Sequence, residues 1–235
     1  MEAALARIAE EPQRAAILLD VDGVLAPIVE RPEDARVPDE TRDELERLRS
    51  RYALVGCVSG RTSADARRVV GIDDLVYVGT HGLELAPDAD RWRSALHEVA
   101  EETDWPIEDK GLTISFHYRD VEDEEAAVAR LELVAENAIS KGLKARWGRK
   151  VLEVLPPVDA NKGTAVRALL EDRGLSRALY AGDDTTDLDA FSALDGLDAA
   201  VRVAVSSSEA PTDLGRAADL VVGSPDALLE LLRRL

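Results

Sequence analysis

The stretch LLDVDGVLAPI, residues 18–28, decides the fold because an apolar run ends there in two carboxylates. With the residues before it, the run reads AAILLD at 15–20, and such continuous apolar character is typical of a strand in a parallel sheet covered on both faces. Asp20 closes the run, Asp22 follows one residue later, and Gly23 comes next. Open parallel sheets bind ligands beyond the carboxyl ends of their strands, so this stretch predicts a site at that edge.

Composition limits the classes of protein to consider. The chain has 235 residues, 46% of them hydrophobic, which is enough to bury a core in one large domain or two smaller ones. Its formal net charge of −18 would repel a phosphate backbone, so we expect no nucleic-acid partner. Apolar runs fall short of the roughly 18 to 20 residues of a membrane span, and no secretory leader is recognisable. We therefore expect a soluble, cytoplasmic protein without a membrane partner.

Two further features of the composition carry expectations. The single cysteine, Cys57, lies in the apolar stretch YALVGCV, so no internal disulfide can form and a buried structural thiol is expected. Acidic residues outnumber basic ones by 47 to 29, and the basic residues are mostly Arg, a balance that resembles proteins adapted to high salt. Under that hypothesis, thermal stability rises between low salt and molar KCl because screening relieves self-repulsion.

Strands and helices alternate at both ends of the chain. Strands are predicted at 52–59 and 75–80 with a helix near 63–70 between them, and an amphipathic helix at 39–50 precedes this group. After Pro156-Pro157 the alternation returns, with predicted helices at 162–172 and 187–194, strands at 178–183, 201–205 and 219–222, and a final helix from Ser224. Because right-handed crossovers join such strands in parallel, the two ends together predict an α/β fold with a doubly wound parallel sheet.

The middle of the chain, residues 82–158, has a different pattern. LTISFHYR at 112–119 alternates between apolar and polar residues, and an amphipathic helix is predicted at 123–140. LKARWG and KVLEVLP, within 143–156, then predict an antiparallel pair of strands. Alternation indicates a sheet with one wet face, so we expect an inserted α+β domain at 82–158 that interrupts a core domain of residues 1–81 and 159–235.

Four polar clusters stand at predicted strand ends or helix starts. They are Asp20-Val21-Asp22-Gly23, Ser59-Gly60-Arg61, Asn161-Lys162-Gly163 and Gly182-Asp183-Asp184-Thr185-Thr186-Asp187. Carboxylates of the first and last clusters could coordinate Mg²⁺, which prefers a few carboxylates, waters and substrate phosphate. Ser59 and Lys162 could hold phosphate oxygens. Such a set would stabilise in-line phosphoryl transfer, in which positioning and charge neutralisation supply most of the catalysis.

Simpler explanations account for single clusters but not for the set. A calcium loop is poorly supported, because Val24 and Arg31 occupy positions at which that pattern wants an acidic or amide ligand and a Glu. A dinucleotide site fails because no G-x-G-x-x-G follows the first strand. Carboxylates placed favourably at a helix N-terminus would explain Asp184 or Asp187 alone. They would not explain the arrival of Asp20 and Asp22 together with Ser59 and Lys162.

The four clusters, in this order and at these separations, resemble the motifs of the haloacid dehalogenase phosphatase superfamily over nearly the whole chain. The resemblance implies that Asp20 is the nucleophile that forms an aspartyl-phosphate, and that Asp22 is the acid/base for the leaving group and for water. It also implies that Ser59 and Lys162 bind the transferring phosphoryl group. Val24 stands where a Thr is frequent in this superfamily.

The same resemblance implies a Mg²⁺ site. The ion would be held by Asp183, the Asp20 carboxylate and the Asp22 backbone carbonyl. The role implied for Asp184 and Asp187 is to support these metal ligands or to orient Lys162. Mg²⁺ is the cofactor that we expect.

Three segments of the insertion and its border resemble the trehalose-6-phosphate phosphatase family. THGLEL at 80–85, FHYRD at 116–120 and GRKVLEV at 148–154 are similar to the HGxE, HYR-like and G-K-x-x-x-E patterns of that family. The resemblance implies a substrate-binding set composed of Gly60, Arg61, His81, Glu84, Arg119, Arg149, Lys150 and Glu153. In it, Glu84, Arg119, Arg149 and Glu153 would contact sugar hydroxyls, because carboxylates accept hydrogen bonds from hydroxyls and cations donate to them. Trp147 is a candidate to stack on a sugar face.

The function expected from the resemblance is Mg²⁺-dependent hydrolysis of trehalose 6-phosphate to trehalose and phosphate, in trehalose biosynthesis. Two departures leave the sugar open: Arg149 stands where the family usually has Lys, and Leu155 where a basic residue commonly precedes Pro. Sucrose 6-phosphate and mannosyl-3-phosphoglycerate are the alternative substrates, and a catalytically weak sugar-phosphate sensor is the alternative class. A two-component receiver is disfavoured, because receivers are about half this length and carry their phosphoacceptor on the third strand. The oligomeric state is left open.

Overall fold

The computed structural model describes residues 2–29, 31–119, 121–148, 150–206 and 211–235. Two compact units form along this chain. The core unit consists of Met1–Gly82 with Ala160–Leu235, and the inserted unit consists of Leu83–Asp159.

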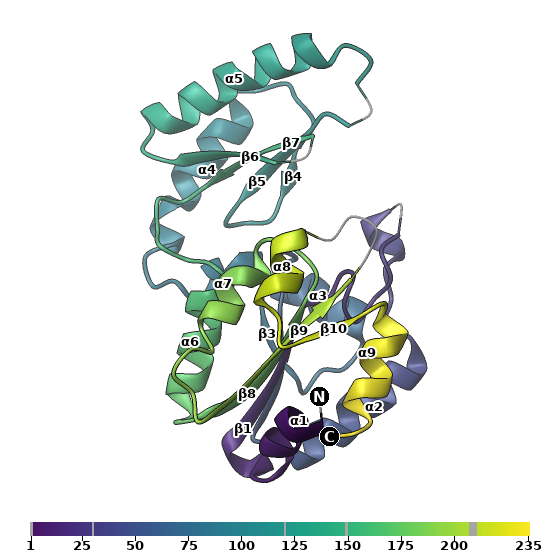
Figure 1. The fold of residues 1–235 in the computed structure, drawn as a ribbon. Coiled ribbons are helices and arrows are strands. Elements are labelled where there is room, and N and C mark those ends of the chain that lie inside the picture. Colours follow the sequence, from purple (N-terminus) through teal and green to yellow (C-terminus); the bar gives the residue numbers. More distant parts are fainter. Residues whose placement is uncertain (1, 30, 120, 149, 207–210) are drawn as a thin grey trace. The chain divides into compact units, whose positions relative to one another are not determined.

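A parallel sheet lies at the centre of the core unit. Among the described residues it has six strands in the order β10-β9-β8-β1-β2-β3 (Figure 1). Their bounds are β1 Ala15–Leu19, β2 Leu54–Val58, β3 Val76–Val78, β8 Arg177–Gly182, β9 Ala199–Val205 and β10 Leu220–Val222. Every residue of β1 is buried, because this strand lies between β2 and β8 and both of its faces are covered. The predicted α/β, doubly wound parallel sheet is confirmed.

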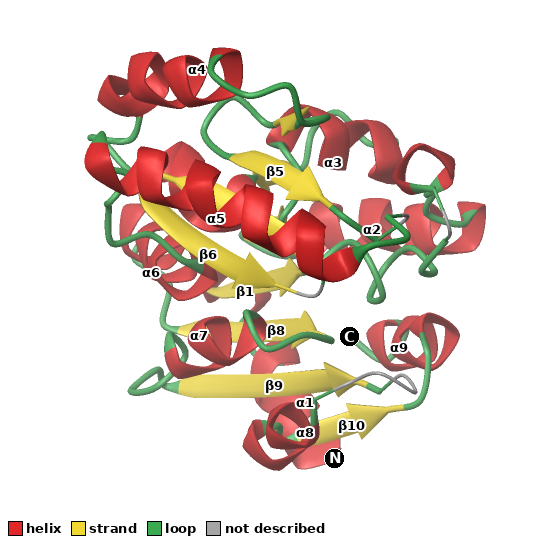
Figure 2. Cartoon of the chain, turned by 90° about the horizontal axis from the view of Figure 1, so that it is seen from above, coloured by secondary structure: helices red, strands yellow, loops and turns green. Residues whose placement is uncertain are grey.

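Helices cover both faces of this sheet, as the views of Figures 1 and 2 show. One face packs against α1 Glu2–Ala9, α2 Asp39–Arg51, α3 Ser63–Val70 and α9 Pro225–Leu232. The other packs against α6 Lys162–Asp172, α7 Asp187–Ser192 and α8 Thr212–Ala217. The side chains of β1 alternate between the two layers, with Ile17 in the first and Leu18 in the second. Because both faces of β1 are covered, polar groups can lie beyond its carboxyl end, at the edge of the sheet.

The inserted unit contains an antiparallel sheet. Its strand order among the described residues is β4-β5-β7-β6. The elements are α4 Arg93–Glu101, β4 Glu108–Asp109, β5 Ile114–His117, α5 Glu124–Ser140, β6 Lys144–Gly148 and β7 Val151–Leu155. One face of the sheet packs against both helices through an apolar cluster that includes Leu96, Phe116 and Leu131. The predicted helix and the predicted hairpin of this region are both present.

The elements that the sequence did not predict are short. α1, α4 and α8 have eight, nine and six residues. Each spans only two turns or so, which leaves few apolar positions from which a helical period could be recognised. The predicted strand at 52–59 begins only at Leu54, because α2 continues to Arg51.

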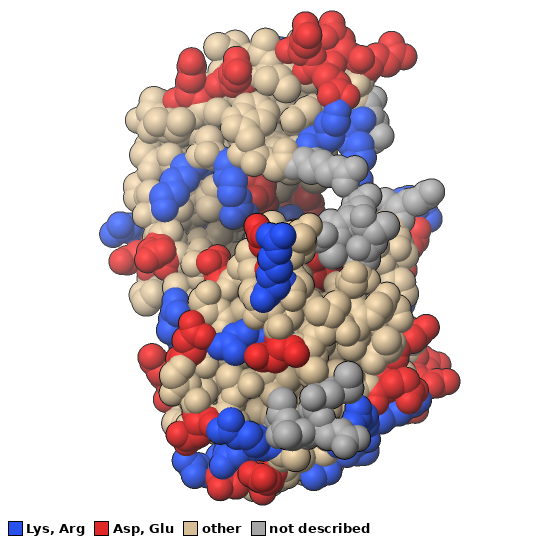
Figure 3. All heavy atoms as spheres, viewed as in Figure 1, with Lys and Arg blue, Asp and Glu red and all other residues tan. Residues whose placement is uncertain are grey.

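The surface of the protein carries charges of both signs. On the face shown in Figure 3, Lys and Arg lie among Asp and Glu. Several arginines pair with an acidic residue three positions earlier, such as Arg49 with Glu46 on α2 at 2.8 Å, and Arg233, just after α9, with Glu230 at 2.6 Å. Within the described part of the chain, no helix combines the length and the apolar character that a membrane crossing requires.

Candidate active site

The carboxyl ends of three neighbouring strands bring the polar clusters together. Asp20 follows β1, Ser59 follows β2, and Asp183 follows β8. Because β2, β1 and β8 are adjacent and parallel, their ends meet at one edge of the sheet. Lys162 is added to this edge by the start of α6.

Lys162 is the centre of a buried ion cluster. Its Nζ donates to Asp20 Oδ2 at 2.5 Å and to Asp187 Oδ1 at 2.7 Å, and its side chain is only 1% exposed. A capping box of Asn161 and Thr164 begins the helix at this residue and so fixes where the lysine leaves the backbone. Burial alone would lower the pKa of Lys162, but the charges of Asp20 and Asp187 outweigh burial and raise it. The lysine is therefore held as an ammonium.

Asp187 has both of its carboxylate oxygens occupied. Oδ1 accepts from Lys162 and from the Tyr180 hydroxyl, each at 2.7 Å. Oδ2 accepts from the backbone N–H groups of Asp183 and Asp184, each at 2.9 Å. Four donors use the acceptor capacity of a carboxylate. Asp187 is thus built to orient Lys162 and the loop after β8, and it has little capacity left for a metal ion.

Asp20 and Asp183 are the carboxylates that can hold a cation. Single oxygens of Asp20, Asp183 and Asp187 all lie within 4.8 Å of one another. Burial raises the pKa of Asp183 to about 8, and the charges of Asp20 and Asp187 add to that rise. Burial also raises the pKa of Asp20, against the opposing effect of Lys162. Two neighbouring carboxylates with raised pKa values, one buried and one partly buried, fit a hard divalent cation such as Mg²⁺, which would relieve their repulsion.

Glycine allows the first and last clusters to approach each other. A Cβ on Gly23 would lie 2.1 Å from Asp183 Oδ2, and Gly23 also has a φ of +75° that favours glycine. The Asp184 side chain, by contrast, is exposed and accepts from the backbone N–H of Thr185 at 2.6 Å. The structure therefore brings Asp183 to the cluster and leaves the Asp184 carboxylate outside it, although the backbone N–H and carbonyl of Asp184 both bond to Asp187.

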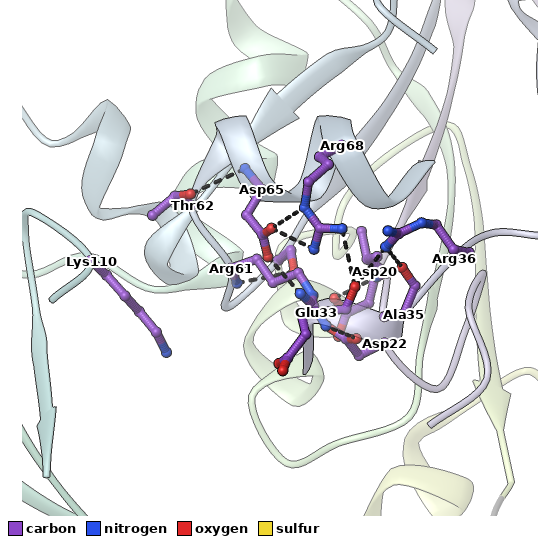
Figure 4. A network of polar contacts seen from close by, with 12 residues as sticks. Asp20, Asp22, Glu33, Ala35, Arg36, Arg61, Thr62, Asp65, Arg68 and Lys110 are labelled. Carbon is purple, nitrogen blue, oxygen red and sulfur yellow. Dashed lines mark hydrogen bonds and ion pairs between the residues drawn. The ribbon is translucent and has the colours of Figure 1, made fainter. Parts of the chain in front are cut away.

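Asp22 forms a paired contact with Arg61 (Figure 4). Arg61 Nε donates to Asp22 Oδ2 at 2.7 Å, and its Nη2 donates to Oδ1 at 2.8 Å. A third bond joins Nη1 to Asp65 Oδ2 at 2.5 Å. The guanidinium that the family resemblance assigned to substrate thus binds two carboxylates of the protein itself.

The loop after β2 is held by the segment after β3. The Ser59 N–H donates to Val78 O at 2.9 Å, and the His81 N–H donates to Ser59 O at 2.9 Å. The His81 ring lies against Gly60, where a Cβ would come within 2.7 Å of two ring atoms. Ser59 is buried, and its Oγ accepts from the Arg61 N–H at 3.2 Å. His81 therefore packs beside the phosphate-binding candidate Ser59 within the core unit.

The sugar-binding candidates of the inserted unit lie mostly on its wet face and in its turns. Glu153 on β7 accepts from Arg146 on β6 at 2.5 Å, and the two residues are cross-strand partners. Arg119 is exposed after β5, and the described residues offer its guanidinium no ion pair. Glu84 is half-buried in the 3₁₀ segment Thr80–Leu85. Trp147 is 42% exposed and meets Tyr118 edge to face at 6.3 Å.

Lys150 differs from its prediction. The sequence placed it on the returning strand, but that strand begins at Val151, and Lys150 stands in the preceding turn with a φ of +60°. There it forms an ion pair with Glu124 at the start of α5. A hairpin turn that needs a left-handed residue explains the shift, because Gly148 still pairs with Val151 on either side of the turn. Arg149 lies outside the described residues.

Tyr180 was missed by sequence reasoning. It is fully buried in β8, stacks edge to face on Phe191 at 6.1 Å, and donates its hydroxyl to Asp187. A signal was available, because a tyrosine inside a continuous apolar strand needs a partner for its hydroxyl, and the nearest polar cluster begins at Asp183.

Comparison with known proteins places the chain in a family. A model of the family described as trehalose-phosphatase matches residues 18–219. The chain belongs to this family. A probable trehalose-phosphate phosphatase 2 of rice (Oryza sativa subsp. japonica) is 30% identical over 265 residues, which cover 95% of this chain and 68% of that protein. An uncharacterized glycosyl hydrolase of Mycobacterium tuberculosis is 36% identical over 214 residues, which cover 77% of this chain and only 15% of that much longer protein.

Solved structures agree with the fold. The crystal structure of a trehalose-6-phosphate phosphatase related protein matches with a TM-score of 0.74 and 25% identity, covering 93% of this chain and 95% of that one. A trehalose-6-phosphate phosphatase of Aspergillus fumigatus matches with a TM-score of 0.69 and 25% identity, covering 99% and 96%. A haloacid dehalogenase-like hydrolase of Bacteroides thetaiotaomicron, at 15% identity and a TM-score of 0.62 over 94% and 99%, shares the fold.

Proposed function

We propose that this chain is a phosphatase that hydrolyses trehalose 6-phosphate to trehalose and phosphate, with Mg²⁺ as cofactor and an aspartyl-phosphate on Asp20. Membership of the trehalose-phosphatase family supports the reaction and the substrate. The observation that carries the mechanism is the buried cluster in which Lys162 contacts both Asp20 and Asp187, with Asp183 beside them. Burying charged groups costs free energy, and such clusters are expected at catalytic sites, where they stabilise the charge that shifts during the reaction.

In the first step, an Asp20 oxygen attacks phosphorus and the bond from phosphorus to the sugar oxygen breaks. Lys162 and Ser59 hold the non-bridging oxygens, so that the negative charge of the phosphoryl group is met by an ammonium and a hydroxyl. Asp22 gives its proton to the departing sugar oxygen. When bound by Asp20 and Asp183, Mg²⁺ would supply the positive charge that lets an anion approach this acidic edge.

In the second step, water attacks the aspartyl-phosphate, and Asp22 accepts the proton of that water. The bond from phosphorus to Asp20 breaks, and phosphate leaves. Asp187 stays hydrogen-bonded to Lys162 and to the loop after β8 throughout, so its part is to hold the lysine in place.

Sugar recognition is proposed for the inserted unit and its border. Glu84, Arg119, Arg149 and Glu153 would bind sugar hydroxyls, as the family resemblance implies, and Lys150 would assist them. Phosphate chemistry alone does not select a sugar, so this set decides between trehalose 6-phosphate and the other sugar phosphates. A cytoplasmic location, close to the supply of sugar phosphates, also belongs to the proposal.

Phosphate release across a panel of sugar phosphates tests the proposal. Trehalose 6-phosphate should be hydrolysed fastest, ahead of sucrose 6-phosphate, glucose 6-phosphate and mannosyl-3-phosphoglycerate, and EDTA should abolish release until Mg²⁺ is restored. Asp20→Asn should abolish release while leaving the thermal unfolding transition in place. Release of phosphate from another sugar at a higher kcat/KM would replace the substrate, and tight binding of trehalose 6-phosphate without turnover would indicate a sensor.

A further inference from the structure

The Asp22 carboxylate depends on one partner for its orientation. Its side chain is 42% exposed and lies on the loop after β1, where solvent alone would leave it several rotamers. Arg61 contacts both of its oxygens, at 2.7 and 2.8 Å, in the side-by-side arrangement that fixes the plane of a carboxylate. The Arg61 side chain is only 11% exposed, so the arginine is much better fixed than the carboxylate that it holds.

Arg61 is anchored from its other side by Asp65. The 2.5 Å bond from Nη1 to Asp65 Oδ2 is accompanied by a bond from Arg68 Nε to Asp65 Oδ1 at 2.8 Å (Figure 4). Thr62 caps α3 by accepting from the Asp65 N–H at 3.1 Å, which fixes the first turn of the helix. Burial would raise the pKa of Asp65, but the hydrogen bonds from Arg61 and Arg68 outweigh it and hold the pKa below its ordinary value. The anchor therefore stays ionised.

The backbone of Arg61 is held by a strained segment. The Thr80 N–H donates to Arg61 O at 2.7 Å, and Thr80 and His81 have φ values of +48° and +53°. A β-branched residue in the left-handed region is unusual, and such backbone strain, about 1 to 3 kcal/mol a residue, persists only where the surroundings enforce it. Here Thr80 and His81 are held in this conformation by the hydrogen bonds from their N–H groups to the carbonyls of Arg61 and Ser59. Both ends of Arg61, main chain and side chain, are thus fixed independently of any ligand.

We propose that Arg61 is a positioning residue that holds the Asp22 carboxylate where it can exchange a proton with the leaving sugar oxygen and with water. The proposal rests on the phosphatase function above. It replaces the substrate-binding role that the resemblance implied for Arg61, because the three bonds of the guanidinium are directed at Asp22 and Asp65.

The leaving group separates positioning from substrate binding. A sugar alkoxide is a poor leaving group and needs the proton of Asp22, whereas p-nitrophenolate leaves without one. Loss of orientation at Asp22 should therefore slow the first step for trehalose 6-phosphate and not for p-nitrophenyl phosphate. The second step needs Asp22 for both substrates.

The experiment compares Arg61→Met with the wild type on both substrates. With trehalose 6-phosphate, kcat should fall about 10- to 100-fold while KM stays within about threefold, because acid-base catalysis contributes on the order of 10² to 10⁴ in rate. With p-nitrophenyl phosphate, the first-turnover release of p-nitrophenolate should stay within about twofold, followed by slow turnover. Arg61→Lys should behave like Arg61→Met, because an ammonium cannot bridge both oxygens. Arg49→Met, at an exposed arginine of α2 that pairs with Glu46, is the matched control and should behave as wild type.

Several results would overturn the proposal. They are a tenfold rise in KM with kcat unchanged, an equal loss in the first turnover of both substrates, and wild-type kinetics.

If Arg61→Met does not fold by circular dichroism, Asp65→Asn replaces it, because that variant keeps Arg61 and removes its anchor. It should lower kcat for trehalose 6-phosphate several-fold with the same leaving-group pattern, and wild-type kinetics there would contradict the proposal. If wild type and Arg49→Met both fail to hydrolyse trehalose 6-phosphate, the proposed function fails. The role of Arg61 can then still be tested by comparing how far Arg61→Met slows the first turnover of an alkyl phosphate and of p-nitrophenyl phosphate.

Discussion

The core unit and the inserted unit use charged residues in opposite ways. At the edge of the parallel sheet, Lys162 and Asp187 are almost completely buried and are bound to each other. On the antiparallel sheet, Glu153 pairs with Arg146, whose side chain is 48% exposed, and His117 pairs with Glu108 in the open. Buried pairs are costly to break, and exposed pairs contribute little. The difference teaches that changes to the buried ion cluster of the core unit should lower both stability and turnover, while changes to the exposed charges of the inserted unit should lower substrate affinity alone.

The largest effect is expected from Lys162→Met. Without the ammonium, Asp20 and Asp187 remain buried and face each other without a counter-charge. Loss of one partner of a buried pair destabilises by about 3 to 5 kcal/mol, and we expect that loss of unfolding free energy together with a loss of phosphate release of 10³-fold or more. Urea unfolding and phosphate release measure the two quantities. Lys144→Met, at an exposed lysine of β6, is the control, and an equal loss of stability there would remove the contrast between the units.

The second effect is a dependence of stability on pH and metal. Burial raises the pKa of Asp183 from 3.8 to about 8, so the protonated form favours the folded state. This contribution is complete below about pH 4 and is lost as pH rises towards 8, at about 1.4 kcal/mol for each unit of pKa shift, or a few kcal/mol in all. EDTA-treated protein should therefore lose unfolding free energy across this range, and Mg²⁺ should restore it at pH 8.

Asp183→Asn is the matched variant for the pH experiment. It removes the titrating group while keeping a side chain of similar size, so the slope of unfolding free energy against pH should flatten and Mg²⁺ should no longer stabilise. Equal slopes in the two proteins would show that Asp183 does not carry the dependence.

A smaller effect, confined to binding, is expected from Glu153→Gln. The ion pair with Arg146 is exposed on one side, so its loss should change the unfolding free energy by less than about 1 kcal/mol. A carboxylate that binds sugar hydroxyls contributes more to affinity, and KM for trehalose 6-phosphate should rise about tenfold with kcat nearly unchanged. Steady-state kinetics measure both. Glu108→Gln breaks the neighbouring pair with His117 and should leave KM as it is; a rise in KM there as well would show a general effect of charge.

The smallest effect on kcat/KM is expected from Tyr180→Phe. Asp187 loses one of its four donors, so Lys162 should be held less firmly and kcat should fall several-fold, with a loss of about 1 kcal/mol in unfolding free energy. Tyr77→Phe is the matched control, because its hydroxyl donates at 2.6 Å to Ile72 O on the far side of the core. It should lose similar stability with no change in kcat. Equal loss of kcat in both variants would contradict a local role for Tyr180.

Much of the fold could be predicted because it depends on local signals. The apolar run of β1 and the Asn161 cap of α6 are each contained within a few residues, and the helix at 162–172 begins and ends where it was predicted. The alternation of strands and helices along the chain then predicts the parallel sheet. The meeting of the polar clusters follows from that topology, since ends of adjacent parallel strands share one edge.

The details of pairing could not be predicted, because they join residues far apart in the chain. Nothing near Arg61 indicates that its guanidinium reaches Asp22 and not a ligand, and nothing near Asp184 indicates that its carboxylate turns away. The saturation of Asp187 depends on Tyr180 and Lys162 together. Lys150 was misplaced for a different reason, since the choice of turn residue in a short hairpin depends on backbone angles that the apolar pattern does not report.

The central claim is that the buried cluster makes Asp20 a nucleophile for phosphorus. Rapid quenching in acid during turnover of ³²P-labelled trehalose 6-phosphate, followed by peptide mapping, tests it most directly. The account predicts one labelled phosphoryl group per chain at most, located on Asp20, removed by hydroxylamine and absent from Asp20→Asn. Turnover at the wild-type rate by Asp20→Asn, or label on a different residue, would contradict the account.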